Sequence, residues 1–330
     1  MISVVSATLR RKKQMQKESR VKVVTAKNAG FCFGVRRAVD TVNELRSKTD
    51  KKIYTIGELI HNSVFVERLK EQNIFVIEEE ELSSLENDKD NIVLVVRAHG
   101  IKKELVEYLE EKGFTYVNAT CPYVERIHEI VDKNTDDAKL CIVMGDKKHP
   151  EAVGTISYAH CDAVVCQDEE ELLENLKLKL TSFEDCFVLT SQTTYNNEKY
   201  VNCQKKAKKL YTNSKIFDTI CSVTEKRQNE VVQLSKECDV MLVVGGKKSS
   251  NTKKLYEISS EHCKATFLVE TADELDKEKI SALCKETLLQ PNTVFTVGIT
   301  AGASTPDDIL EEVKVGASEI IITASGETTT

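Results

Sequence analysis

In the stretch Gly30-Phe31-Cys32-Phe33-Gly34-Val35, a cysteine follows a short apolar segment and opens an amphipathic one. We predict a strand that ends before the cysteine and a helix that begins at it. The pattern returns in Ala119-Thr120-Cys121-Pro122-Tyr123-Val124 and in Thr219-Ile220-Cys221-Ser222-Val223-Thr224, so the three cysteines are 89 and 100 residues apart. Spacing this wide and this regular indicates an internal repeat of a structural unit.

The sequence that follows each cysteine strengthens the repeat. A second apolar strand ends at a glycine 24 or 25 residues after the cysteine, at Gly57, Gly145 or Gly245. Four residues later a polar cluster begins a new helix. The three clusters are His61-Asn62, His149-Pro150-Glu151 and Ser249-Ser250-Asn251. Because the offsets agree to one residue, chance is a poor explanation for them.

A third strand in each unit ends in another small or polar loop, at residues 97–100, 191–194 and 300–304. Short apolar strands that alternate with amphipathic helices are typical of parallel sheets, so we predict an α/β fold. Loops after such strands meet at one edge of the sheet. Three units packed around a threefold axis would therefore bring the cysteines and the polar loops into one cavity.

The predicted units cover residues 23–120, 121–218 and 219–314, and the two ends differ from them. Residues 1–22 carry seven Lys or Arg and one acid, which predicts a disordered basic tail. An organelle transit peptide is the alternative, and we expect it less than a cytoplasmic protein. Residues 315–330 are predicted to form a short apolar strand and a frayed polar tail.

Composition excludes several classes of function. The chain has 330 residues and a net charge of -7, so its bulk surface does not favour nucleic acid. Its apolar runs are too short to cross a bilayer, so we expect no membrane partner. Eleven cysteines without a secretory h-region argue for a reducing compartment, where a few thiols can be metal ligands.

Cys32, Cys121 and Cys221 are the candidate metal ligands. Each lies at a predicted helix N-terminus, where free N–H groups lower the pKa of a thiol. Three related thiolates fit an iron-sulfur cluster with one open iron, or a zinc ion. The remaining cysteines are interpreted as small buried hydrophobes: Cys141, Cys161, Cys166, Cys186, Cys203, Cys238, Cys263 and Cys284.

The polar loops predict an anion site. His61, His99 and His149 lie at strand ends, and the run 249–251 and Ser304 lie at predicted helix starts. Such residues often only cap helices, but imidazoles, hydroxyls and amides that meet in one cavity also bind phosphate. Glu151 lies among them. A bound polyanion beside it would raise its pKa and suit it to proton donation; a solvated helix-start acid is the alternative.

These motifs together resemble the 4-hydroxy-3-methylbut-2-enyl diphosphate reductase family over about residues 23–312. The matching strings are Gly30-Phe31-Cys32 with Gly34-Val35, His61-Asn62, Ala98-His99-Gly100, Ala119-Thr120-Cys121-Pro122, His149-Pro150-Glu151, Gln192-Thr193-Thr194, Ser249-Ser250-Asn251 and Thr300-Ala301-Gly302-Ala303-Ser304. As an ordered set they are highly specific. The basic tail at 1–22 departs from the shorter bacterial pattern and leaves the localisation in doubt.

The resemblance implies a pseudo-threefold trefoil of α/β units around one 4Fe-4S cluster held by Cys32, Cys121 and Cys221. It implies that Glu151 delivers protons and that Thr193 orients it and the substrate hydroxyl. The implied diphosphate-binding residues are His61, His99, His149, Ser249, Ser250, Asn251 and Ser304, with Thr193 also touching substrate. The implied reaction is a two-electron, two-proton removal of the C4 hydroxyl at the open iron, which forms isopentenyl and dimethylallyl diphosphate in the non-mevalonate isoprenoid pathway.

The resemblance also implies an external electron donor such as ferredoxin or flavodoxin, because no flavin or nicotinamide fingerprint occurs in the chain. Two readings from other classes remain open on the residues alone. One is a zinc-dependent hydrolase that uses the three thiolates, and the other is a noncatalytic protein that binds a phosphate ligand through the polar loops.

Overall fold

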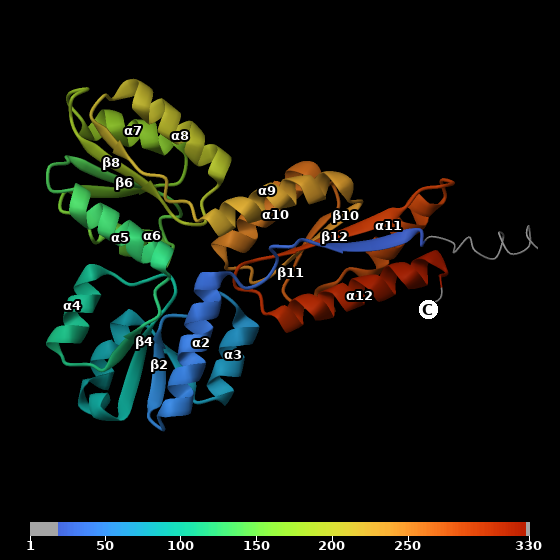
Figure 1. Cartoon of the computed structure of the whole chain (residues 1–330), viewed down its shortest axis with the longest axis horizontal. Coiled ribbons are helices and arrows are strands. Elements are labelled where there is room, and N and C mark those ends of the chain that lie inside the picture. Colours follow the sequence, from blue (N-terminus) through green and yellow to red (C-terminus); the bar gives the residue numbers. More distant parts are fainter. Residues whose placement is uncertain (1–18, 328–330) are drawn as a thin grey trace, which may run out of the picture.

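The computed structural model describes residues 19–327 and contains three α/β units, each built on a four-stranded parallel sheet. The units are arranged around a common centre, with the first in blue to teal, the second in green to olive and the third in orange to red (Figure 1). This arrangement confirms the predicted α/β class and trefoil. Among the described residues, no helix combines the length and apolarity that a membrane span requires.

The first unit has strand order β3-β2-β4-β5. Its elements are α2 (Phe33–Lys48), β2 (Lys52–Ile56), α3 (Ser63–Glu71), β3 (Ile74–Ile77), the 3-10 helix η1 (Glu79–Asn91), β4 (Ile92–Val96), α4 (Lys103–Glu111) and β5 (Tyr116–Asn118).

The second unit repeats this order as β7-β6-β8-β9. Its elements are α5 (Pro122–Asn134), β6 (Leu140–Met144), α6 (Pro150–Ile156), β7 (Asp162–Cys166), α7 (Glu169–Lys179), β8 (Phe187–Ser191), α8 (Asn197–Leu210) and β9 (Ser214–Ile216).

The third unit has the same order, β11-β10-β12-β1, but its last strand comes from the other end of the chain. Its elements are β1 (Val21–Thr25), α9 (Ser222–Glu237), β10 (Val240–Val244), α10 (Ser250–His262), β11 (Thr266–Val269), η2 (Ala272–Glu274), α11 (Lys277–Leu288), β12 (Phe295–Ala301) and α12 (Asp307–Ser325).

Strand β1 corrects the predicted unit boundaries and the predicted basic tail. It pairs in parallel with β12, from Val21 opposite Phe295 to Thr25 opposite Ile299. Arg20 is ordered too, because its Nη2 donates to the carbonyls of Leu288 and Gln290 at 2.8 and 2.9 Å. Part of the segment 1–22 is therefore structural. The rest of that prediction lies outside the described residues.

The predicted strand in 315–330 is wrong, because α12 runs through most of this segment. The run Ile320-Ile321-Ile322 is β-branched and short, and by itself such a run does not distinguish a strand from a buried helix. The helical period is visible further upstream: Ile309, Val313 and Ala317 are buried at four-residue spacing and pack into the core of the third unit.

The strands are buried because helices cover both faces of each sheet, so they consist of nearly continuous apolar residues. Strands β4, β6 and β10 are buried at every position. The strands before the three cysteines are edge strands: β1 pairs with β12, β5 with β4 and β9 with β8. Each sheet thus delivers its loops toward the centre of the molecule.

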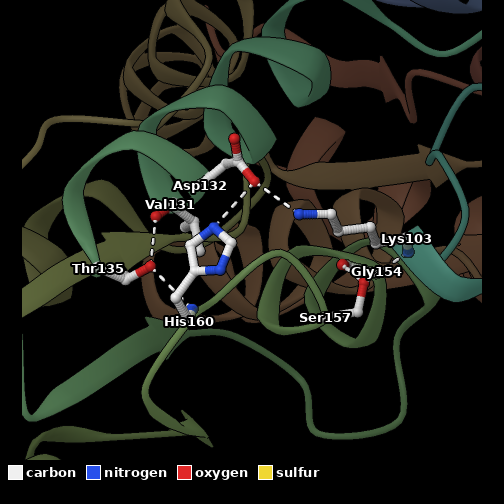
Figure 2. Close-up of polar contacts among 7 residues, drawn as sticks. All are labelled: Lys103, Val131, Asp132, Thr135, Gly154, Ser157 and His160. Carbon is white, nitrogen blue, oxygen red and sulfur yellow. Dashed lines mark hydrogen bonds and ion pairs between the residues drawn. The ribbon is translucent and has the colours of Figure 1, made fainter.

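A polar contact joins the first and second units close to α6 (Figure 2). Asp132 Oδ1 accepts from Lys103 Nζ at 2.9 Å and contacts His160 Nε2 at 3.2 Å. The backbone N–H of Lys103 donates to Ser157 Oγ, which in turn donates to the carbonyl of Gly154 near the end of α6. The contact therefore fixes the helix that begins at Pro150, and with it the neighbouring polar cluster.

Candidate active site

One cavity lies where the three units meet. Its walls include Cys32, Cys121, Cys221, His61, His99, His149, Glu151, Thr193, Ser249, Ser250, Asn251 and Ser304. These are all the residues that the sequence predicts as metal ligands, substrate contacts or proton donors. Because they come from three units and from loops up to 272 residues apart, from Cys32 to Ser304, only the folded trefoil brings them together.

Cys32, Cys121 and Cys221 are the N-cap residues of α2, α5 and α9. Cys32 Sγ accepts a hydrogen bond from the N–H of Val35 at 3.5 Å. Burial raises the pKa of Cys121 to about 11 and also raises that of Cys221, and in both it outweighs the lowering effect of the first-turn N–H groups. The predicted lowering is thus reversed in the metal-free protein, although a bound metal deprotonates a thiol outright.

The packing around the cysteines leaves room for a group between them. Gly34 lies beside Cys121, and a Cβ at this glycine would stand 2.5 Å from Cys121 Sγ. The absence of a side chain at residue 34 therefore lets the start of α2 approach the second cysteine. Any larger residue there would push into the space that the thiols share.

The spacing of the thiols bears on which metal they fit. His61, His99 and His149 have ligand atoms within 4.8 Å of one another, and the residues described contain no other such group. Three thiolates on one zinc ion are about 3.8 Å apart, given the usual Zn–S distance. A cluster would instead bind each thiolate through a different iron.

The three histidines form one compact group. His61 stacks on His99 with ring centroids 4.5 Å apart, and His149 meets both rings edge-on at 5.4 and 5.1 Å. His149 Nδ1 accepts from the N–H of Glu151, so its proton lies on Nε2 when the ring is neutral. His61 Nδ1 lies 3.2 Å from Glu58 Oε2, which makes Nδ1 the donor toward this carboxylate.

Burial and mutual repulsion disfavour the charged forms of His99 and His149. Burial lowers the pKa of His149 to about 3 and that of His99 well below its ordinary value. His61 lowers both further, and His149 also lowers that of His99. His99 Nδ1 and Asn251 Nδ2 are buried, and neither has a hydrogen-bond partner among the described residues. Polar atoms of this kind at a cavity wall are suited to bind a ligand.

The serine residues have structural contacts beside the cavity. Ser249 is the N-cap of α10 and its Oγ accepts from the N–H of Thr252, so the capping role considered from the sequence is real. Ser304 Oγ donates to the carbonyl of His61 at 3.2 Å and thereby links the third unit to the histidine group. Ser250 Oγ accepts from Thr194 Oγ1 at 3.4 Å.

Glu151 and Thr193 form the most deeply buried polar pair of the cavity. Glu151 is 1% exposed, and its Oε1 and Oε2 accept from the backbone N–H and the Oγ1 of Thr193 at 2.5 and 2.8 Å. Burial raises the pKa of Glu151 to about 7, against the lowering effect of the two bonds. Burial thus raises the pKa of Glu151 in the ligand-free protein, and the further effect of a bound polyanion stays a prediction.

Sequence reasoning missed Arg227, which lines the same cavity and is 2% exposed. A signal was present, because Thr224, Arg227 and Val231 share the buried face of α9 at helical spacing. An arginine on such a face is rare enough to indicate a special environment. Tyr123, Thr194 and Thr224 are further wall residues to which the sequence assigned no role, although each lies in one of the motif strings quoted above.

The fold and the cavity define the class of protein. It is a trefoil α/β enzyme whose central site joins three cysteines to a buried acid, three histidines and several polar side chains. The model of the LytB protein family matches residues 23–316. The chain therefore belongs to the LytB family, whose curated relatives described below are reductases, and it is an oxidoreductase.

Curated relatives carry the name 4-hydroxy-3-methylbut-2-enyl diphosphate reductase. The protein of Clostridium perfringens strain 13 is 43% identical over 291 residues, which cover 88% of this chain and 96% of the relative. The protein of Caldanaerobacter subterraneus subsp. tengcongensis is 40% identical over 295 residues, which cover 89% and 95%.

Two solved structures share the fold. A structure of (E)-4-hydroxy-3-methyl-but-2-enyl diphosphate reductase, described as the terminal enzyme of the non-mevalonate pathway, is 37% identical, with a TM-score of 0.63 and coverage of 91% of this chain and 99% of that one. The E-1-hydroxy-2-methyl-but-2-enyl-4-diphosphate reductase of Plasmodium falciparum is 25% identical, with a TM-score of 0.76 and coverage of 88% and 86%.

Proposed function

We propose that the chain reduces 4-hydroxy-3-methylbut-2-enyl diphosphate to isopentenyl and dimethylallyl diphosphate, with one 4Fe-4S cluster held by Cys32, Cys121 and Cys221. The observation that carries the proposal is the joining of these three helix-capping cysteines with Glu151 and the histidine group in one cavity. The names of the relatives supply the substrate. When bound, the cluster supplies electrons and an open iron as a Lewis acid for the substrate's C4 oxygen.

The protein's own contribution begins with the diphosphate. Nε2–H of His149 and the amide of Asn251 are donors at the cavity wall, and α10 begins there with free N–H groups. Ser250 and Ser304 add hydroxyls. Neutral and helix-terminal donors hold a polyanion without surface lysines, and a diphosphate held at one end fixes the position of the allylic alcohol at the other.

Glu151 performs the proton transfer. With a pKa near 7, a large fraction of its carboxyl is protonated at neutral pH and can donate the proton from an Oε atom to the departing hydroxyl. Hydroxide is a poor leaving group, so this proton turns it into water. Thr193 holds both oxygens of the carboxyl, and its hydroxyl is free to turn toward the substrate when Glu151 is protonated.

The reaction consumes two electrons that the chain does not store, so the proposal includes a small external redox protein such as a ferredoxin or flavodoxin as donor. It also places the enzyme in a reducing compartment, such as the cytoplasm. All eleven cysteines lie among the described residues as free thiols, which is the usual state in that compartment.

The proposal is tested by anaerobic turnover of 4-hydroxy-3-methylbut-2-enyl diphosphate with dithionite and a viologen mediator. We expect both isoprenyl diphosphates as products, with two electrons consumed per substrate. A zinc-dependent hydrolase would instead release phosphate without consuming reductant, and a noncatalytic binding protein would return the substrate unchanged. Either of these two results would refute the proposed reaction.

Loss of one diphosphate contact should weaken binding without unfolding the protein. We expect His61→Phe and Asn251→Ala each to raise the dissociation constant for substrate at least about tenfold, the effect of losing about 1.4 kcal/mol of hydrogen bonding to a charged group. Isothermal titration with substrate measures this dissociation constant, and titration with inorganic diphosphate tests whether the loss concerns the diphosphate contact. His262→Phe is the matched control because His262 is exposed and is the last residue of α10, at the opposite end of that helix from the cavity. Unchanged affinity in both cavity variants would contradict the assignment.

Anion binding should strengthen as the pH falls. A bound anion favours the charged form of His99 and His149, so it raises their pKa above the low values of the ligand-free protein. At a pH between the pKa of a histidine in the ligand-free protein and its pKa in the complex, binding of the anion protonates that histidine. The affinity for the anion therefore increases as the pH falls. Sulfate is the suitable probe because it does not titrate in the range used.

Between pH 8 and pH 6 we expect the dissociation constant of sulfate to fall at least about tenfold. The dependence should become weaker in His149→Phe. Glu151→Gln serves as a control because the pKa of Glu151 lies in the same range, and its removal separates the two contributions. An affinity that is constant, or that falls with acidity, would show that anion binding does not protonate the histidines.

A further inference from the structure

Arg227 is a buried cation beside two of the cysteines. It lies in the second turn of α9, and its side chain reaches back to the loop before Cys32, where Nη2 donates to the carbonyl of Gly30 at 2.8 Å. The residue lines the cavity together with Cys32 and Cys221. Its Nε and Nη1 atoms are buried and have no hydrogen-bond partner among the described residues.

The charge of Arg227 has no carboxylate partner. The ion pairs within residues 19–327 do not include this guanidinium, although many exposed pairs occur. Glu230, one turn further along α9, is engaged elsewhere: it accepts from the backbone N–H of Lys27 at 2.6 Å and from Asn28 Nδ2 at 2.7 Å. Arginine does not lose its proton in proteins, so the buried charge is not relieved by neutralisation.

A buried charge without a partner is strongly destabilising, so its environment must gain an anion in the functional state. Burial lowers the pKa of Arg227, and the neighbouring groups that can carry a compensating negative charge include Cys32, Cys221 and Glu230. Cys32 and Cys221 are the residues that would become thiolates on loading with iron and sulfide. The orphaned Nε–H and Nη1–H groups are therefore donors for an anionic centre at this place.

We propose that Arg227 is the counter-cation of the iron-sulfur cluster and raises its reduction potential. The inference rests on the proposed function, because it assumes a cluster at the three cysteines. One-electron reduction of the cluster by an external one-electron donor adds one negative charge and changes no bond. A fixed cation next to the thiolates stabilises the reduced form more than the oxidised form, so it makes the electron easier to accept.

Arg227→Met and Arg227→Lys separate charge from packing. Methionine keeps an unbranched side chain of similar reach but has no charge, whereas lysine keeps the charge with fewer donors. Arg36→Gln is the matched control, because Arg36 lies one turn after Cys32 but is exposed and paired with Asp307 at 3.3 Å. Each protein is loaded anaerobically with iron and sulfide, and its cluster is titrated with dithionite under spectroscopic control.

At a fixed potential we expect the ratio of reduced to oxidised cluster to fall at least tenfold in Arg227→Met, which corresponds to about 59 mV for one electron. The ratio should stay within about threefold in Arg227→Lys and should not change in Arg36→Gln. A purely structural arginine would not move the potential. A ratio within about twofold of wild type in loaded Arg227→Met overturns the inference.

Thermal unfolding of the cluster-free proteins gives a second readout. Because the unpaired charge destabilises the cluster-free state, cluster-free Arg227→Met should melt at or above the wild-type temperature, and loading should stabilise it less than wild type. If Arg227→Met cannot be loaded, this melting result together with a loaded Arg227→Lys supports the inference.

Lower melting temperatures and failed loading in both Arg227 variants would show that the residue only stabilises the fold, and would overturn the inference. A wild-type chain that takes up no iron and sulfide would refute the proposed function itself, so the two failures are distinguishable.

Discussion

Replacing Glu151 with glutamine should reduce turnover by a factor of about 100 to 10,000, the usual contribution of general acid catalysis. Glutamine has the size of glutamate and can still accept a bond from Thr193, but it has no proton to donate. The cluster and the affinity for substrate should therefore persist. The measurement is anaerobic turnover with dithionite and a viologen, beside iron quantification and a substrate titration.

Thr193→Val is the graded control for this experiment. It removes the Oγ1 contact to Glu151 Oε2 but keeps the backbone N–H that donates to Oε1, so the carboxyl loses one of its two orienting bonds. Its effect on turnover should be smaller than that of Glu151→Gln. If Glu151→Gln turns over within about threefold of wild type with full cluster content, a different group supplies the proton.

Serine at Cys32, Cys121 or Cys221 should remove most of the cluster. The serine hydroxyl is a much weaker ligand for iron than a thiolate, and only three protein ligands are available in the proposed site. Iron and acid-labile sulfide per chain, measured after anaerobic loading of each variant, report the loss. Turnover should fall in proportion to the cluster that remains.

Cys161→Ser is the matched control, because Cys161 is a partly exposed free thiol that does not line the cavity and whose Sγ donates to the carbonyl of Asp162. It should load as wild type does. Full iron and sulfide content in all three of the cavity variants would eliminate these cysteines as the ligand set and would reopen the question of what the cavity binds.

The repeat made most of the fold predictable. Cysteine, glycine and polar cluster recur with constant offsets, and each marks the carboxyl end of a parallel strand, so the loops could be assigned to one edge before any coordinates. The pairing of β1 with β12 was not predictable, because the repeat says where strands occur but not which end of the chain completes the last sheet. The C-terminal helix α12 was not predicted, because the short apolar run 320–322 alone does not distinguish a helix from a strand. The helical spacing of the buried residues upstream of this run is what indicates the helix.

The site was predictable as a set of residues and less so in its energetics. Cys121 shows the difference: the helix N-terminus acts on the thiol in the expected direction, but burial acts more strongly, and burial depends on packing between units. Burial also raises the pKa of Glu151, to about 7, which suits this carboxyl to proton donation at neutral pH. Arg227 was not found because a single arginine has meaning only once its surroundings are known to lack a carboxylate.

The most direct test is the metal content of the full-length wild-type chain, purified without oxygen and assayed for iron, acid-labile sulfide and zinc. The account predicts about four irons and four sulfides per chain and no stoichiometric zinc. One zinc per chain without sulfide, or a metal-free protein that nevertheless turns over substrate, would contradict it.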